Sequence, residues 1–74
     1  MMKYEHRAMY DSFGTDNYTV DKENSFSKEI TEEQAKQFVE FWTAIGCKHY
    51  ETSKAHVYEK QHDARHITAF VLYK

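Results

Sequence analysis

The sequence predicts a small α+β domain in which one helix covers one face of an antiparallel β-sheet. Residues 30–46 show helical periodicity, and the segments on both sides alternate as strands do. The resulting order, ββαββ, packs most simply as a four-stranded antiparallel sheet with the helix on one face. The 74 residues, of which 41% are hydrophobic, are enough for one small core. We therefore assign residues 1–74 to a single domain.

Two strands are expected before the helix. Residues 2–11 alternate over their whole length, and residues 18–23 form a second, shorter alternating segment. Residues 11–17 between them are rich in turn-forming residues, which predicts a hairpin loop. Residues 24–29 then lead to the helix, with Phe26 as an anchor under this connection.

The helix carries a signal at each end. Thr31 is the expected N-cap, and Gln34 three residues later completes a capping box. Gly46 is placed to adopt the left-handed conformation that ends many helices. The apolar face is formed by Ala35, Phe38, Val39, Trp42 and Ile45. We expect Trp42 to be buried. The sheet residues expected to contact this face are Val20, Val57, Phe70 and Leu72.

Two more strands are expected after the helix. Residues 47–60 contain neither glycine nor proline, which predicts one long strand with room for a bulge near residues 52–53. Residues 61–64 form the next turn, and residues 65–74 are apolar on both faces near their end. Such a strand is either central in the sheet or uses one face for a partner. At a sheet edge it would pair with a second copy, so a homodimer is also expected.

One long strand at 47–60 would place its even-numbered residues on a single basic and aromatic face. The candidate partner-binding residues on this basic-aromatic stripe are Lys48, Tyr50, Lys54, His56, Tyr58 and Lys60. Such a face suits contact with another protein. It also suits single-stranded RNA or DNA, because aromatic rings stack on bases while lysines neutralise phosphates. The third interpretation is an ordinary solvated strand face.

Acidic residues precede and begin the helix. The candidate partner-binding residues among them are Asp21, Glu23, Glu29, Glu32 and Glu33. Acidic residues of this kind commonly provide solubility and favourable charge at a helix N-terminus. An acidic edge could also mimic a phosphate backbone and occupy a basic nucleic-acid channel in another protein.

Neither a metal site nor a cofactor is expected. His62-Asp63-x-x-His66 and Cys47-x-His49 contain metal-ligating residue types, but a structural zinc site needs four convergent ligands. Cys47 follows the end of the helix, where the helix dipole raises a thiol pKa and makes the residue a poor nucleophile.

The sequence does not indicate an enzyme. It contains neither a nucleophile elbow nor a glycine-rich phosphate loop. A small ribonuclease-type toxin, using His56 or His66 with Tyr58, is the alternative that this absence leaves open.

Charge and cysteine content bear on compartment and partners. Residues 1–47 carry nine acidic against five basic residues, whereas residues 48–74 carry three against five. A single cysteine fits a reducing compartment, and neither a signal peptide nor a membrane-spanning segment is recognisable. We therefore expect a cytoplasmic protein without a membrane partner.

The function expected from this pattern is binding to another protein without catalysis. Small domains of this kind include inhibitors and accessory factors that phages and mobile elements encode, of the anti-CRISPR or host-takeover class. That expectation comes from what small domains without motifs commonly do. The alternative function is a single-stranded nucleic-acid-binding module that uses the basic-aromatic stripe.

Overall fold

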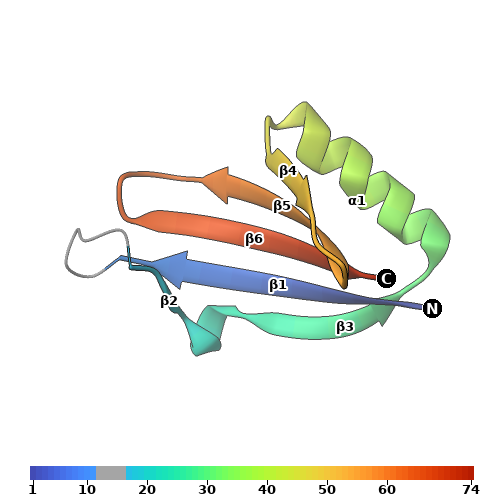
Figure 1. Ribbon diagram of the computed structural model, residues 1–74, viewed down its shortest axis with the longest axis horizontal. Helices are drawn as coiled ribbons and strands as arrows, with labels where there is room; N and C mark the ends of the chain where they lie inside the picture. The colour runs from blue at the N-terminus through green and yellow to red at the C-terminus, as the bar shows by residue number, and fades with distance from the viewer. Residues whose placement is uncertain (12–16) are drawn as a thin grey trace.

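The computed structural model describes residues 1–11 and 17–74. Within these ranges, six strands form one antiparallel sheet, and a single α-helix, α1 (Glu32–Ala44), lies across one face of it (Figure 1). The strands are β1 (Met2–Tyr10), β2 (Thr19–Val20), β3 (Phe26–Ile30), β4 (Lys48–Glu51), β5 (Ala55–Gln61) and β6 (His66–Tyr73). The predicted α+β class is confirmed, but the predicted number of four strands is wrong. The centre of the predicted hairpin loop, residues 12–16, lies outside the described residues.

The strand order is β2-β1-β6-β5-β4, and β3 pairs with the first half of β1 on the same side as β2. β6 therefore lies between β1 and β5 and is hydrogen-bonded on both sides. This explains why its sequence is apolar on both faces, as one of the two interpretations predicted. Because both of its edges are occupied, β6 cannot pair with a second copy through an edge contact.

The segment between β1 and the helix forms two strands rather than one. A 3-10 helix, η1 (Lys22–Asn24), separates β2 from β3. The Asp21 side chain accepts a hydrogen bond from the backbone N–H of Glu23, while the Ser25 hydroxyl donates to the Asp21 carbonyl. This corner turns the chain so that β3 pairs along β1 instead of serving as a connection. Phe26 is consequently not an anchor under a connection, since it is 50% exposed on β3.

The segment 47–60 is a hairpin, β4–β5, and not one long strand. The hydroxyl oxygen of Thr52 accepts hydrogen bonds from the backbone N–H groups of Lys54 and Ala55, and the Thr52 N–H donates to the Ala55 carbonyl. A threonine side chain thus builds a turn that needs neither glycine nor proline. Glu51 pairs with His56 across this turn.

Both predicted ends of the helix are confirmed. The Thr31 hydroxyl accepts from the Gln34 N–H, and the Gln34 side chain accepts from the Thr31 N–H, which is a complete capping box. Gly46 has φ of 82°, and the N–H groups of Gly46 and Cys47 donate to the carbonyls of Thr43 and Trp42. This is a Schellman ending, and it requires the left-handed backbone that glycine adopts without strain.

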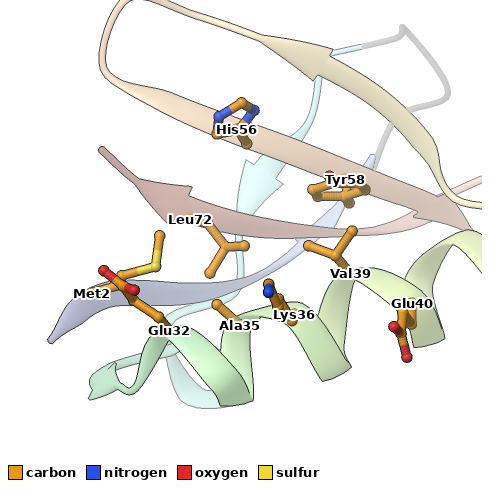
Figure 2. A pocket seen from close by; sticks show the side chains of 9 residues that line it. All are labelled: Met2, Glu32, Ala35, Lys36, Val39, Glu40, His56, Tyr58 and Leu72. Atoms are coloured by element: carbon orange, nitrogen blue, oxygen red, sulfur yellow. The ribbon is translucent and has the colours of Figure 1, made fainter.

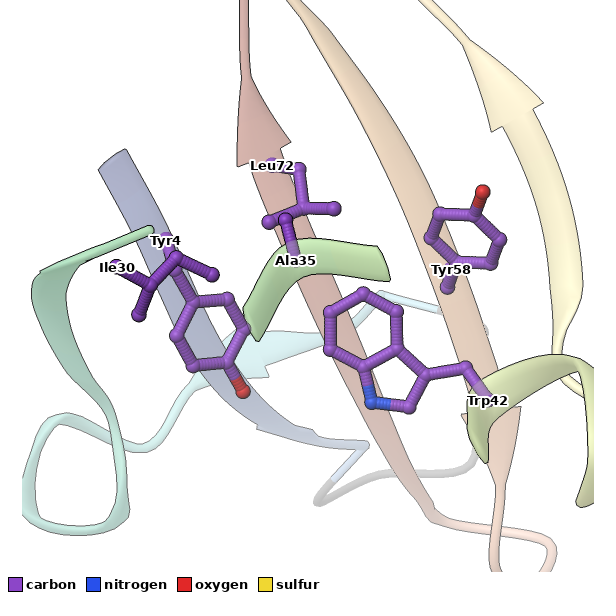
Figure 3. Close-up of a cluster of buried hydrophobic side chains, with 6 residues drawn as sticks. All are labelled: Tyr4, Ile30, Ala35, Trp42, Tyr58 and Leu72. Atoms are coloured by element: carbon purple, nitrogen blue, oxygen red, sulfur yellow. The ribbon is translucent and has the colours of Figure 1, made fainter. Parts of the chain in front are cut away.

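The main core lies between α1 and the sheet (Figure 3). Its buried residues are Tyr4, Ile30, Ala35, Trp42, Tyr58 and Leu72, with Phe38, Ile45 and Phe70 packed against them. The burial of Trp42 is confirmed, at 3% exposure. The expected contacts of Val20 and Val57 with the helix are wrong, because Val57 is buried in a different cluster and Val20 is exposed.

Candidate functional site

Two hollowed surfaces of the described chain lie on opposite faces of the sheet. The first is a groove between α1 and β5, of about 620 Å³, which we call the helix–sheet groove (Figure 2). Its apolar floor is formed by Met2, Ala35, Val39, Tyr58 and Leu72. Its polar rim is formed by Glu32, Lys36, Glu40 and His56.

The rim of the helix–sheet groove is charged on the helix side. Glu32, Lys36 and Glu40 follow one another at four-residue intervals, so they form one row along α1. Figure 2 shows Lys36 on α1 between Glu32 and Glu40, which lie towards opposite ends of the groove. His56 closes the strand side, and its imidazole lies 3.9 Å from the Glu51 carboxylate. The helix–sheet groove thus has an apolar floor and an acidic residue near each end.

The second surface is the face of the sheet opposite the helix, which we call the open sheet face. Its floor consists of four small buried residues on the two neighbouring strands β5 and β6. They are Ala55, Val57, Ala69 and Val71, with exposures between 2% and 8%. The helix packs against the other cluster, and Met9 and Tyr73 pack against these four residues. The hollow above the floor measures about 380 Å³.

Longer side chains form the walls of the open sheet face. The Tyr50 hydroxyl donates to Glu59 at 2.5 Å, and the Tyr73 hydroxyl donates to Glu5 at 2.8 Å. Arg7 donates to the same Glu5 oxygen at 2.6 Å. Burial raises the pKa of Glu5, but the hydrogen bonds from Tyr73 and Arg7 outweigh it, so the net pKa is lowered. Both tyrosines have a raised pKa, chiefly because each donates to a carboxylate. The walls are thus ordered by hydrogen bonds to the carboxylates of Glu5 and Glu59.

The basic-aromatic stripe predicted at 47–60 does not form one surface. The pairing of Glu51 with His56 places odd-numbered residues of β4 with even-numbered residues of β5. His56 and Tyr58 therefore face the helix, whereas Tyr50 lies on the open sheet face. Tyr58 is buried, at 8% exposure, rather than presented to solvent.

The three lysines of the stripe are also separated. Lys60 donates to the Ile45 carbonyl at 2.8 Å and so caps the end of the helix. Lys54 lies in the β4–β5 turn and lines the hollow of the open sheet face. Lys48 begins β4 and pairs in register with Glu59. A continuous track for a phosphate backbone is not formed by these residues.

The acidic candidates are spread over three elements. Asp21 caps η1 and Glu23 lies within it, so Asp21 has a structural role. Glu29 is on β3, paired in register with Lys3. Of the two at the helix N-terminus, Glu32 lines the helix–sheet groove and Glu33 does not. They therefore lie on consecutive elements, from η1 through β3 to the first turn of α1.

His49 and His56 stack with their ring centroids 5.7 Å apart, and the other histidines lie elsewhere in the chain. His62 is hydrogen-bonded to the Thr68 hydroxyl at 2.7 Å, and His66 to Asp63 at 2.9 Å. Among residues 1–11 and 17–74, no group of three or more ligating side chains could hold a metal ion. The pKa of the Cys47 thiol is raised, as expected, although burial rather than the helix dipole is the main cause.

Several residues of both surfaces are not predicted by the sequence pattern. Met2 reaches the helix–sheet groove from β1, whose place in the sheet is not encoded locally, whereas the expected contact of Leu72 with the helix is confirmed. The floor of the open sheet face does have a signal, because small or β-branched residues alternate with larger ones in residues 66–73.

His6, at the edge of the core, should make the stability of the protein depend on pH. Its imidazole stacks on Phe26 at 4.9 Å and meets Phe70 edge-on, with the Tyr4 hydroxyl 3.3 Å from Nδ1. Burial, together with the charge of nearby His62, lowers its pKa below 6.5. Protonation then favours the unfolded chain, so we expect stability to be full above about pH 7 and to fall as pH drops below about 6.5.

Urea unfolding midpoints between pH 5 and 7.5 measure this effect. His6→Phe keeps a ring between Phe26 and Phe70 and should show a flatter profile in this range. Glu5, Glu51 and Asp63 have lowered pKa values, so the stability that they contribute is lost below about pH 4.5, outside the range in which His6 titrates. Equal slopes for the two proteins would show that His6 is not the titrating group.

Comparison of the chain with known protein families, with curated protein sequences and with solved structures gives no match. Within the part of the chain that the structure describes, no helix has the length and apolar character needed to cross a membrane.

Proposed function

We propose that this chain is a non-enzymatic protein-binding domain that contacts its partner through the helix–sheet groove. The single observation that carries this proposal is the apolar floor of the groove, which opens to solvent beside a charged row on α1. Apolar hollows with a polar rim hold the anchor side chains that dominate many protein interfaces. The groove also includes three residues expected to bind a partner, namely Glu32, His56 and Tyr58.

The charges of the rim indicate what kind of segment the groove would accept. Glu32 and Glu40 are eight residues apart on α1, which separates them by roughly 12 Å along the helix axis. In an extended segment, residues four apart are separated by roughly 13 Å and point to the same side, as does the residue midway between them. A basic-x-apolar-x-basic segment would therefore place one basic residue near each glutamate and the apolar residue over the floor.

Lys36 lies between the two glutamates and does not contradict this assignment. The methylene stem of a lysine can cover apolar surface while its ammonium group stays in water. The partner's apolar side chain would then pack against Val39 and Tyr58 beside the Lys36 stem. An inhibitor or accessory factor of the kind that phages encode would act by occupying such a segment of its target.

We do not propose the nucleic-acid-binding alternative. Binding of nucleic acid would require one continuous face that joins Tyr50, His56 and Tyr58 to three lysines. These residues lie on two opposite faces of the sheet, and Tyr58 is buried in the core.

A displayed library of random peptides tests the groove and does not require the natural partner to be identified. We expect the immobilised protein to enrich peptides with an apolar residue flanked by basic residues. Binding of the enriched peptides should weaken about tenfold for Glu32→Lys/Glu40→Lys, because two attractive charge contacts become repulsive. The affinity of synthetic peptides can be measured by fluorescence anisotropy.

The matched control is Glu23→Lys/Glu29→Lys, which makes the same change in net charge outside the groove. It should bind the enriched peptides as tightly as the native chain. If Glu32→Lys/Glu40→Lys binds them equally well, or if the enriched peptides lack basic residues, the groove is not the contact surface.

A further inference from the structure

The floor of the open sheet face is covered by side chains of its own strands and not by the helix, and the charged side chains of this face are arranged in a way that matches the face to itself. We propose that a second copy of this chain covers the open sheet face, through a two-fold axis that runs parallel to β6. This surface lies on the opposite side of the sheet from the helix–sheet groove, so the inference does not depend on the function proposed above.

The pairing register places one charged row across the open sheet face. Arg7 on β1 pairs with Ala69 on β6, and Ala69 pairs with Glu59 on β5. Arg7 and Glu59 therefore flank Ala69, one on each side. A two-fold axis along β6 exchanges the two sides and lays Arg7 of each copy over Glu59 of the other. Each dimer would contain two such ion pairs.

Both groups can accept this additional contact. Arg7 already donates to Glu5, but a guanidinium carries five N–H donors. Glu59 accepts from Tyr50 through Oε1, and a carboxylate has a second oxygen. The contact between copies therefore does not require either internal hydrogen bond to break.

The same axis lays long side chains on β1 over small ones on β5 in two rows of the face. Lys3 is in the same cross-strand row as Tyr73 and Ala55, because the β1–β6 register continues from Tyr4 to Lys3 and Ala55 pairs with Tyr73. The axis thus lays the long Lys3 side chain over the small Ala55 of the second copy. In this row the long residue on β1 thus lies over a small residue on β5, while Tyr73, on the axis, lies over Tyr73 of the second copy.

The next row shows the same relation. Glu5 pairs with Val71 and Val71 with Val57, while Tyr50 and Ser27 lie at the two ends of this row. Exchange of the two sides lays Tyr50 of one copy over Ser27 of the other, and Glu5 over Val57. Large side chains again meet small ones, which is what interdigitation of two packed sheets requires.

The available area fits a reversible dimer. Four strands about 4.8 Å apart and a β6 about 27 Å long give a footprint of roughly 500 Å² per copy. The two copies together would bury about 1,000 Å², which is near the lower limit for a specific interface. We therefore expect association that depends on protein concentration rather than a permanent dimer.

Charge reversal gives a direct test by sedimentation equilibrium between about 10 µM and 1 mM protein. The native chain should associate reversibly into dimers. Arg7→Glu and Glu59→Arg should each raise the dimer dissociation constant by about tenfold, since each creates two like-charged contacts. An equimolar mixture of the two variants should associate as well as the native chain, because the introduced glutamate of one variant then lies over the introduced arginine of the other. Lys36→Glu, on the helix side, is the matched control and should not change association.

Far-UV circular dichroism shows whether each variant is folded. If Arg7→Glu does not fold, the dissociation constant of Glu59→Arg alone tests the interface. The inference is overturned if the native chain remains monomeric at 1 mM. It is also overturned if folded Glu59→Arg dimerises as tightly as the native chain, or if folded variants fail to associate when mixed. A dimer that is weakened by Lys36→Glu and not by Glu59→Arg would place the interface on the helix side instead.

Discussion

Replacing Trp42 by alanine should unfold this domain. The indole is 3% exposed, stacks on Phe70 at 4.7 Å, and lies 5.2 Å from the ring of Tyr58 and 5.8 Å from that of Tyr4. Removing a buried tryptophan costs about 3–5 kcal/mol, because transfer free energy is lost and a cavity remains. A domain of this size has a total stability of about 3–5 kcal/mol. The expected result is the loss of a cooperative unfolding transition in far-UV circular dichroism.

The adjacent residue provides the control for this experiment. Phe41 is also an aromatic residue of α1, but it is 60% exposed. Phe41→Ala should therefore change the free energy of unfolding by no more than about 0.5 kcal/mol. A folded Trp42→Ala protein with a native midpoint would mean that α1 does not pack on the sheet through this residue.

Replacing Tyr58 by alanine should have the second-largest effect. Its ring lies between Trp42 at 5.2 Å and His49 at 4.4 Å, and burial raises the pKa of its hydroxyl. By comparison with other buried aromatic residues, the substitution should cost about 3 kcal/mol, which leaves much of the protein unfolded. Urea unfolding followed by tryptophan fluorescence measures this loss, since Trp42 is the single tryptophan.

Tyr50→Ala is the matched control, because Tyr50 is the same residue type on the opposite face and is 43% exposed. Its cost should stay below about 1 kcal/mol when measured at low micromolar concentration, where association does not contribute. A larger loss for Tyr50→Ala than for Tyr58→Ala would mean that the β4–β5 register is shifted by one residue, since such a shift exchanges the two faces.

The register of this hairpin also explains which part of the candidate site was predictable. His56, Tyr58 and Tyr50 are recognisable from the sequence as candidate contact residues, but their faces depend on a turn built by the side chain of Thr52. A turn without glycine, proline or an Asn-Gly pair has no strong local signal. A continuous strand in place of this turn assigns every later residue to the wrong face relative to β4.

Local chemistry is sufficient for α1. The capping box of Thr31 and Gln34, the apolar stripe and Gly46 act within a few residues of one another. The amino-acid sequence alone therefore specifies where the helix begins and ends, and that Trp42 is buried. The α+β class follows from the same local patterns.

The arrangement of the strands depends on the tertiary structure. β1 is long enough for β2 and β3 to pair with successive parts of one edge, and β6 enters between β1 and β5 from the end of the chain. These pairings join residues far apart in sequence, and they are selected by how the whole sheet buries its two apolar clusters. The helix–sheet groove and the open sheet face are both products of that arrangement, which is why neither could be derived from one stretch of sequence.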